Sequence, residues 1–258
     1  MASPRATVVV PLYIWPTSSA SWEPLYESIS THPTVDFLVV VNPDSGPGGE
    51  PLPGHDYERE LPKLNAAANV CTIGYVRIDY CRKPLHETCE EIDRFAGWAK
   101  DRGDKPNLAM HGIYVDETPN HYSAGRALYL EALHKHIKSR EGLLGQRLVR
   151  LIFHNPGTPP DSELASPAIV DVIITCEEPY QRYSGEQVQT RLREYFVDRT
   201  RSGYQISDVS RNVIRKVVGE LRHKGAYIFA TSLVEDFYES FGECWREFVS
   251  AMDTIENW

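Results

Sequence analysis

Carboxylates stand at the ends of two hydrophobic, β-rich runs. Asp116 and Glu117 end the run His111–Glu117, and Glu177 follows the run Val170–Cys176. When carboxyl groups face one another in a partly apolar pocket, one stays protonated while another stays ionised. Glycoside hydrolysis needs that arrangement. We therefore take Asp116, Glu117 and Glu177 as candidate catalytic residues, with the roles of acid, base and nucleophile left open among them.

A second interpretation of these acids is structural. Glu117 and Glu178 both precede a residue pattern that could open a helix, and acids favour helix N-termini. Alternation along a strand turns Glu178 away from Glu177, so we do not place it in the site.

Aromatic and amide groups end the other hydrophobic runs. Aromatic rings can stack on sugar rings, and amides, imidazoles and hydroxyls can bind sugar hydroxyls by hydrogen bonds. We expect a substrate-binding set at these positions: Tyr13, Trp15, Asn42, Tyr80, His154, Asn155, Tyr180 and Thr231.

Other chemistries lack their motifs. His86-Glu87-Thr88-Cys89-Glu90 begins like a zincin helix but has Glu at the position of the second His. Gly46-Pro47-Gly48-Gly49 lacks the Lys-Ser/Thr of a phosphate loop, and no G-x-S-x-G elbow is present. His111 begins its strand, which would place it at the opposite end of a barrel from Asp116. We expect no metal and no cofactor.

The elements that must position these residues alternate between strand and helix. Nearly continuous runs of Val, Ile, Leu, Phe and Tyr are typical of strands buried on both faces of a parallel sheet. The strand runs are Thr7–Trp15, Asp36–Asn42, Thr72–Ile78, His111–Glu117, Leu148–Asn155, Val170–Cys176 and Ala226–Thr231. The helical patterns are Trp22–Thr31, Tyr57–Asn69, Leu85–Arg102, Ser123–Arg140, Gly185–Arg193, Asp208–Lys224 and Val234–Trp258.

This alternation predicts an α/β fold, a (β/α)8 barrel that forms a single domain over residues 1–258. One strand is hard to find. The seventh must be irregular and lie at Glu194–Val197 or at Tyr204–Ile206. In such a barrel all strand ends above share one face, where active sites are built.

Composition excludes several classes of protein. With 41% hydrophobic residues the chain can bury a core, and no apolar run is long enough to span a membrane. A net charge of -9 with dispersed Lys and Arg argues against nucleic-acid partners. Five cysteines without C-x-x-C spacing favour free thiols, with a Cys71–Cys81 disulfide as the alternative. We expect a monomer.

The first residues, Met1-Ala-Ser-Pro-Arg-Ala, show no leader pattern before Thr7. We therefore expect a cytoplasmic protein. The alternative is a secreted protein whose leader is absent from this sequence.

Five motifs together resemble the spherulin-4 family, which includes glycoside hydrolase family 135. They are Val10-Pro-Leu-Tyr-Ile-Trp-Pro16, Asn42-Pro-Asp-Ser-Gly-Pro-Gly48, Gly74-Tyr-Val76, Gly112-Ile-Tyr-Val-Asp-Glu117 and Asp171-Val-Ile-Ile-Thr-Cys-Glu177. The resemblance covers roughly residues 8–235. It implies a (β/α)8 barrel that hydrolyses polysaccharide containing N-acetylgalactosamine, with Asp116, Glu117 and Glu177 as essential acids.

Three hypotheses of function follow. The first is a metal-independent glycosidase that cleaves an amino-sugar polymer or oligosaccharide. The second is a repurposed barrel enzyme that acts on a small metabolite with the same acids. The third is a carbohydrate-binding protein without turnover. Release of reducing ends from a galactosamine polymer distinguishes the first hypothesis from the others.

Overall fold

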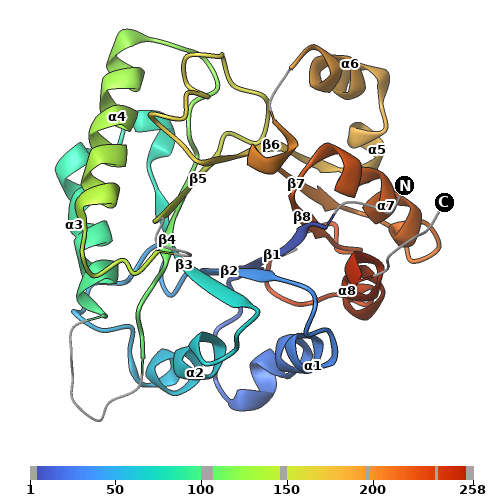
Figure 1. The fold of residues 1–258 in the computed structure, drawn as a ribbon, viewed down its shortest axis with the longest axis horizontal. Helices are drawn as coiled ribbons and strands as arrows, with labels where there is room; N and C mark the ends of the chain where they lie inside the picture. Colours follow the sequence, from blue (N-terminus) through green and yellow to red (C-terminus); the bar gives the residue numbers. More distant parts are fainter. Residues whose placement is uncertain (1–4, 100–106, 146–149, 196–197, 236–237, 254–258) are drawn as a thin grey trace.

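Eight parallel strands form a closed barrel at the centre of the molecule. The computed structural model describes residues 5–99, 107–145, 150–195, 198–235 and 238–253. The strands follow one another around the barrel in chain order, and the last pairs with the first (Figure 1). They are β1 Thr7–Leu12, β2 Phe37–Val41, β3 Val70–Arg77, β4 Gly112–Asp116, β5 Leu151–Asn155, β6 Val172–Pro179, β7 Ser202–Ser207 and β8 Tyr227–Ala230. The predicted (β/α)8 barrel is confirmed.

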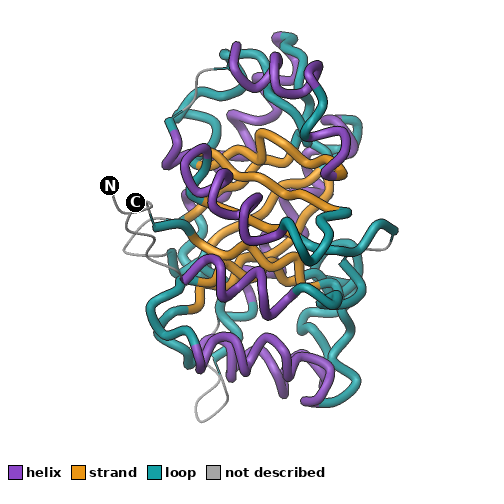
Figure 2. Tube along the Cα trace, turned by 90° about the vertical axis from the view of Figure 1, so that its right-hand side faces the viewer, coloured by secondary structure: helices purple, strands orange, loops and turns teal. Residues whose placement is uncertain are grey.

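Helices surround the strands on the outside, as the side view in Figure 2 also shows. The α-helices are α1 Glu23–Thr31, α2 His55–Asn65, α3 Leu85–Gly97, α4 Ala124–Ser139, α5 Tyr180–Tyr183, α6 Glu186–Glu194, α7 Ile214–Lys224 and α8 Trp245–Asp253. Short 3-10 turns lie at η1 Ser19–Trp22, η2 Asp79–Cys81 and η3 Arg199–Arg201.

Burial on both strand faces explains the hydrophobic runs. All five residues of β2 are buried, because one face fills the barrel and the other packs against helices. Where a helix comes closest, the strand carries glycine: a Cβ on Gly74 of β3 would lie 2.7 Å from the Phe95 ring of α3. Gly74 therefore allows α3 to pack directly on the barrel.

The seventh strand lies at Ser202–Ser207, so Tyr204–Ile206 is the right alternative. The Glu194–Val197 alternative is wrong, because Glu194 ends α6, while residues 196–197 lie outside the described residues. The strand is hard to detect because Ser, Gly and Gln interrupt its hydrophobic pattern. The pairing of β6 with β7 is irregular, with a register shift between Ile174 and Cys176.

The last helix is shorter than predicted. It begins at Trp245, whereas the sequence pattern predicts Val234–Trp258. Gly242 has a φ of +69°, a left-handed conformation that a continuous helix cannot contain. Trp245 and Phe248 are buried against the barrel as expected, Phe241 packs from the preceding loop, and Phe237 lies outside the described residues.

No helix lies between β5 and β6 in residues 156–171, all of which are described (Figure 1). A small separate cluster of Ala165, Val170 and Ile173, with Tyr195 against it, replaces the helix. The Arg201 guanidinium donates to the carbonyl oxygens of Asp171, Ala165 and Val170 and so ties this segment down.

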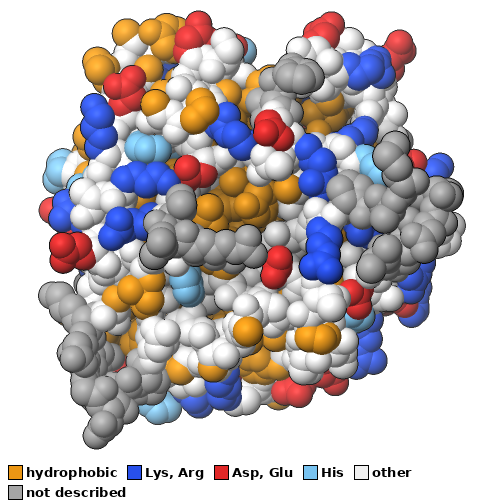
Figure 3. All heavy atoms as spheres, viewed as in Figure 1, with side chains coloured by type: hydrophobic (Ala, Val, Ile, Leu, Met, Phe, Trp, Pro, Cys, Tyr) orange, Lys and Arg blue, Asp and Glu red, His pale blue; other side chains and the backbone are white. Residues whose placement is uncertain are grey.

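The surface mixes both signs of charge. On the face shown in Figure 3, Lys and Arg side chains are interspersed with Asp and Glu around a central hydrophobic region. Among the described residues, no helix is long and apolar enough to cross a membrane.

All five cysteines are free, as predicted. Cys71 lies near the amino end of β3, and Cys81 lies beyond the carboxyl end of the same strand. An extended strand therefore separates them, which rules out the alternative disulfide in this structure.

Candidate active site

Asp116 and Glu177 meet through one amide group at the carboxyl-terminal end of the barrel. Asn155 Nδ2 donates to Asp116 Oδ1 at 2.8 Å and to Glu177 Oε2 at 2.6 Å. Asp116 ends β4, Asn155 ends β5, and Glu177 lies on β6, so three neighbouring strands supply the group. The two carboxyl oxygens can lie no farther apart than the sum of those two distances.

Gly157 fixes the orientation of this amide. Its backbone N–H donates to Asn155 Oδ1 at 3.0 Å, which leaves the Asn155 NH2 group to face the two acids. The Gly157 carbonyl also accepts the backbone N–H of Glu177 at 3.0 Å. Gly157 has a φ of +66°, a conformation that favours glycine. One left-handed turn after β5 therefore positions both Asn155 and Glu177.

Tyrosine hydroxyls engage the remaining oxygens of the pair. Tyr75 donates to Asp116 Oδ2 at 2.7 Å, and Tyr238 donates to Glu177 Oε1. The ring of Tyr13 lies between these two tyrosines, with centroids 5.4 Å from Tyr75 and 4.9 Å from Tyr238. The acids therefore lie beneath an aromatic surface.

Burial makes the charged form of Glu177 costly. Desolvation raises the pKa of Glu177, and the nearby charge of Asp116 raises it further. Hydrogen bonds from Tyr238 and Asn155 lower that pKa only in part. The raised pKa therefore makes the protonated form, which a general acid requires, more populated in Glu177 than in an ordinary carboxyl.

The surrounding phenols remain protonated. Burial raises the pKa of Tyr13, Tyr75, Tyr114 and Tyr238, and neighbouring carboxyl groups raise these pKa values further. These residues can therefore serve as hydrogen-bond donors at every pH at which the protein would act.

The third candidate acid lies apart from the pair. Glu117 has a φ of +51°, and its Oε2 lies 3.4 Å from Arg77 Nε. Its side chain is part-exposed on the β3 side of the rim, so the structure joins Asp116 to Glu177 but not Glu117 to either. Glu178 stays within β6 and pairs with Arg182 and Arg191, away from the barrel interior, as alternation predicts.

The proposed substrate-binding residues differ in how close they lie to the acids. Tyr13 and Asn155 contact the acid pair or its tyrosines. Trp15, on the loop after β1, and Tyr80, in η2 after β3, expose about half of their surface at the rim. Tyr180 starts α5 and is partly buried against the core.

The remaining three lie away from the acids, and two of them hold their own loops. Asn42 accepts the N–H of Gly46, and Thr231 Oγ1 accepts that of Leu233, so both hold their own loops. His154 is buried on the face of β5 opposite to Asn155, near His134 of α4. Burial lowers the pKa of His154 to about 3 and keeps it neutral. The structure does not bring His154 to the acids.

Four residues of the site were not among the sequence candidates. Tyr75 and Tyr238 donate hydrogen bonds to the acids. Gln205 lies opposite Glu177 on β7. Its Nε2 donates to the hydroxyl of Tyr114, the fourth residue, at 2.5 Å. Tyr114 precedes Asp116 by two positions, so strand alternation could have placed it on the same face. Tyr75 lies within the Gly74-Tyr-Val76 motif, whereas Gln205 and Tyr238 carry no such signal.

The arrangement can perform acid–base chemistry on a bound substrate. It offers a protonated carboxyl, a second carboxyl beside it and neutral donors that hold both in place. Within the described residues, no group of three or more His, Cys, Asp or Glu side chains could hold a metal ion.

The fold and this site define a class of protein, the closed (β/α)8 barrels with paired carboxylates at the carboxyl ends of neighbouring strands. The model of spherulation-specific family 4 matches residues 7–252. The chain belongs to this family.

Solved structures agree with this assignment. The crystal structure of Aspergillus clavatus Sph3 in complex with GalNAc is 35% identical, with a TM-score of 0.89 over 97% of this chain and 98% of that one. An endo-beta-N-acetylglucosaminidase from Cordyceps militaris is 11% identical, with a TM-score of 0.56 over 98% of this chain and 92% of that one.

A GH18 chitinase, ChiB from Flavobacterium johnsoniae, is 10% identical with a TM-score of 0.55, covering 97% of this chain and 94% of that one. At such low identity these last two structures show a shared barrel fold alone. No curated protein matches the chain.

Proposed function

We propose that this protein is a glycoside hydrolase that cleaves a polysaccharide containing N-acetylgalactosamine or galactosamine. The observation that carries the proposal is the Asp116–Asn155–Glu177 group, in which a partly buried carboxyl with a raised pKa lies beside a second carboxyl. The GalNAc complex of the 35% identical Sph3 supports the sugar class.

The proposed reaction divides its roles by environment. Glu177, whose pKa is raised, gives its proton to the glycosidic oxygen as the bond from that oxygen to the anomeric carbon breaks. Asp116 attacks the anomeric carbon and forms a glycosyl ester. Water then cleaves this ester, while Glu177 takes a proton from the water and returns to its starting form. No metal takes part in these steps.

The spacing of the acids favours a retaining outcome. Retaining enzymes hold their carboxyl groups about 5–5.5 Å apart, whereas inverting enzymes need about 6.5–9.5 Å to admit water. Asn155 bridges the two acids with hydrogen bonds of 2.8 and 2.6 Å, which brings their nearest oxygens below the inverting range. We expect the first product released to keep the anomeric configuration of the substrate, as measured by proton NMR.

Release of reducing ends from a partly deacetylated galactosamine polymer tests the proposal. Wild-type protein should release them, with and without a chelator, and folded Glu177→Gln should not. Saturable sugar binding with no turnover by the wild type would contradict the proposal and favour a binding protein.

A further inference from the structure

Trp15 is an exposed ring that is nevertheless fixed in orientation. The residue is 48% exposed, yet its Nε1–H donates to Asp56 Oδ2 at 2.9 Å. The ring also meets Tyr57 edge-on, with centroids 5.2 Å apart and planes at 88°. Both partners lie in the first turn of α2, so this helix holds the indole while one side of it faces solvent.

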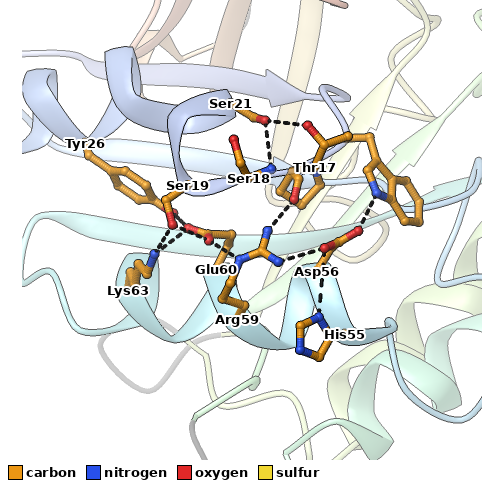
Figure 4. Close-up of polar contacts among 12 residues, drawn as sticks. Thr17, Ser18, Ser19, Ser21, Tyr26, His55, Asp56, Arg59, Glu60 and Lys63 are labelled. Atoms are coloured by element: carbon orange, nitrogen blue, oxygen red, sulfur yellow. Dashed lines mark hydrogen bonds and ion pairs between the residues drawn. The ribbon is translucent and has the colours of Figure 1, made fainter.

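Arg59 ties the Trp15 loop to α2 (Figure 4). Its guanidinium donates to Asp56 Oδ1 at 2.7 Å and to the Pro16 carbonyl at 2.5 Å. Arg59 therefore binds Asp56, which accepts the indole N–H, and also Pro16, which follows Trp15 in the chain. The position of the ring therefore depends on Asp56 and Arg59 together.

Glu60 anchors this network in the protein. Its side chain is fully buried and accepts hydrogen bonds from Ser19, Tyr26, Arg59 and Lys63, all of them labelled in Figure 4. Burial alone would raise the pKa of Glu60, but these hydrogen bonds outweigh it and lower the pKa to about 2. Glu60 is thus a permanent anion that fixes Arg59.

The ring lies across the barrel mouth from the acids. Trp15 follows β1, whereas Asp116 and Glu177 flank β5, and β1 and β5 are opposite each other in a closed barrel of eight strands. Tyr13, two residues before Trp15, already contacts the tyrosines that hold the acids. Tyr13 therefore connects the tyrosines around the acids to the Trp15 loop, and we expect a ligand that contacts both the acids and Trp15 to contain more than one sugar unit.

We propose that Trp15 is a platform for a distant sugar unit of an extended amino-sugar chain, and that Asp56 is the residue that positions it. This inference rests on the proposed function for its ligand class. Because Asp56 already fixes the indole, the ring loses little rotational freedom when a sugar stacks on it. Orientation by Asp56 therefore increases the affinity for the sugar. The platform makes long chains bind more tightly than short ones.

Binding of sized fragments of a partly deacetylated galactosamine polymer to folded Glu177→Gln tests the inference, because turnover is removed. In that background, Trp15→Ala should weaken binding of long fragments about tenfold, the effect of losing one aromatic stacking contact. N-Acetylgalactosamine itself should bind with the same affinity in both proteins.

The Asp56 variants separate a positioning role from a general structural one. Asp56→Leu should approach the loss seen with Trp15→Ala, whereas Asp56→Asn, which keeps an oxygen to accept the indole N–H, should retain most of the affinity. Combining Trp15→Ala with Asp56→Leu should add nothing further. Glu27→Gln is the matched control, since its ion pair with Arg246 is also exposed but lies on α1 and α8.

Equal affinity of long fragments for Trp15→Ala and its parent would overturn the inference, as would an equal loss for the single sugar. Either result leaves the proposed hydrolysis intact. Conversely, if wild type binds long fragments through Trp15 but cleaves none of them, the proposed function fails while the platform stands.

Discussion

Glu60 is a fully buried carboxylate and Glu177 a partly buried one, and their partners differ in charge. Glu60 receives two cationic groups, Arg59 and Lys63, together with two hydroxyls, and its pKa falls to about 2. Glu177 receives only a phenol and an amide among the described residues, faces the carboxyl of Asp116, and has a raised pKa.

This difference separates a carboxylate that holds structure from one that can exchange a proton. Cationic partners stabilise the ionised form and make Glu60 a fixed anion. Neutral donors orient Glu177, and its raised pKa makes it easier to protonate than an ordinary carboxyl, as a general acid requires. The kind of partner, more than the depth of burial, therefore distinguishes the two sites.

The largest effect should come from removing the exchangeable proton. We expect folded Glu177→Gln to lose turnover, by at least the 10²–10⁴-fold that a positioned acid contributes. Asp116→Asn should lose about as much. Reducing-end assays on both variants measure this, with circular dichroism to verify folding. Wild-type rates in both variants would remove the acid pair from the mechanism.

The stability of Glu177→Gln should depend on pH. Because the pKa of Glu177 is raised in the folded state, ionisation at higher pH favours the unfolded chain. The wild type should therefore lose stability relative to Glu177→Gln as pH rises above about 4.5, the ordinary value. Thermal melts from pH 4 to 8 measure the melting temperature of Glu177→Gln minus that of the wild type. This difference should increase with pH, and a decrease would contradict the raised pKa.

The next effect concerns the structural carboxylate. Glu60→Gln should lower the free energy of unfolding by about 2 kcal/mol at pH 7, below the usual cost of breaking a buried ion pair because Arg59 and Lys63 are partly exposed. Since the folded pKa is lowered to about 2, this difference should persist above pH ~5 and shrink as pH falls toward 2. Denaturant titrations at several pH values provide the measurement.

A smaller effect is expected for the phenol above Glu177. The Tyr238 hydrogen bond lowers the pKa of Glu177, so its loss in Tyr238→Phe should raise that pKa. The alkaline limb of the kcat/KM profile should move to higher pH, and the rate at the optimum should fall about tenfold. Tyr122→Phe, an exposed tyrosine on the loop after β4, is the control. An unchanged alkaline limb would show that Glu177 is not the proton donor.

The smallest effect should come from Glu178→Gln. Its carboxyl pairs with Arg182 and Arg191 outside the barrel, and neither pair reaches the acids. Turnover should stay within about twofold, and stability should fall by no more than about 1 kcal/mol. If this variant is inactive while Glu177→Gln is active, the two adjacent acids have exchanged roles.

The barrel was predictable because its strands are hydrophobic on both faces and alternate with amphipathic helices. Asp116 and Glu177 could be predicted as site residues for the same reason, since each ends or follows a hydrophobic run. β7 was obscured because Gln205 faces the site and interrupts the pattern. Tyr238 was hidden because it lies in the loop before α8, where the sequence continues with helical spacing. Contacts between distant segments, such as Asn155 with both acids, follow only from the closed barrel.

The segment between β5 and β6 affects how the site can come apart. These two strands align at only Phe153 with Val172 and His154 with Ile173, and no helix covers their connection in residues 156–171. The β1–β8 seam has as few aligned pairs, but the β5–β6 seam also lacks a covering helix, so its backbone amides should be among the first barrel amides to exchange with deuterium. Asn155 lies on one side of the seam and Glu177 on the other. A transient opening there would separate the acids and switch off the chemistry while the rest of the barrel stays folded.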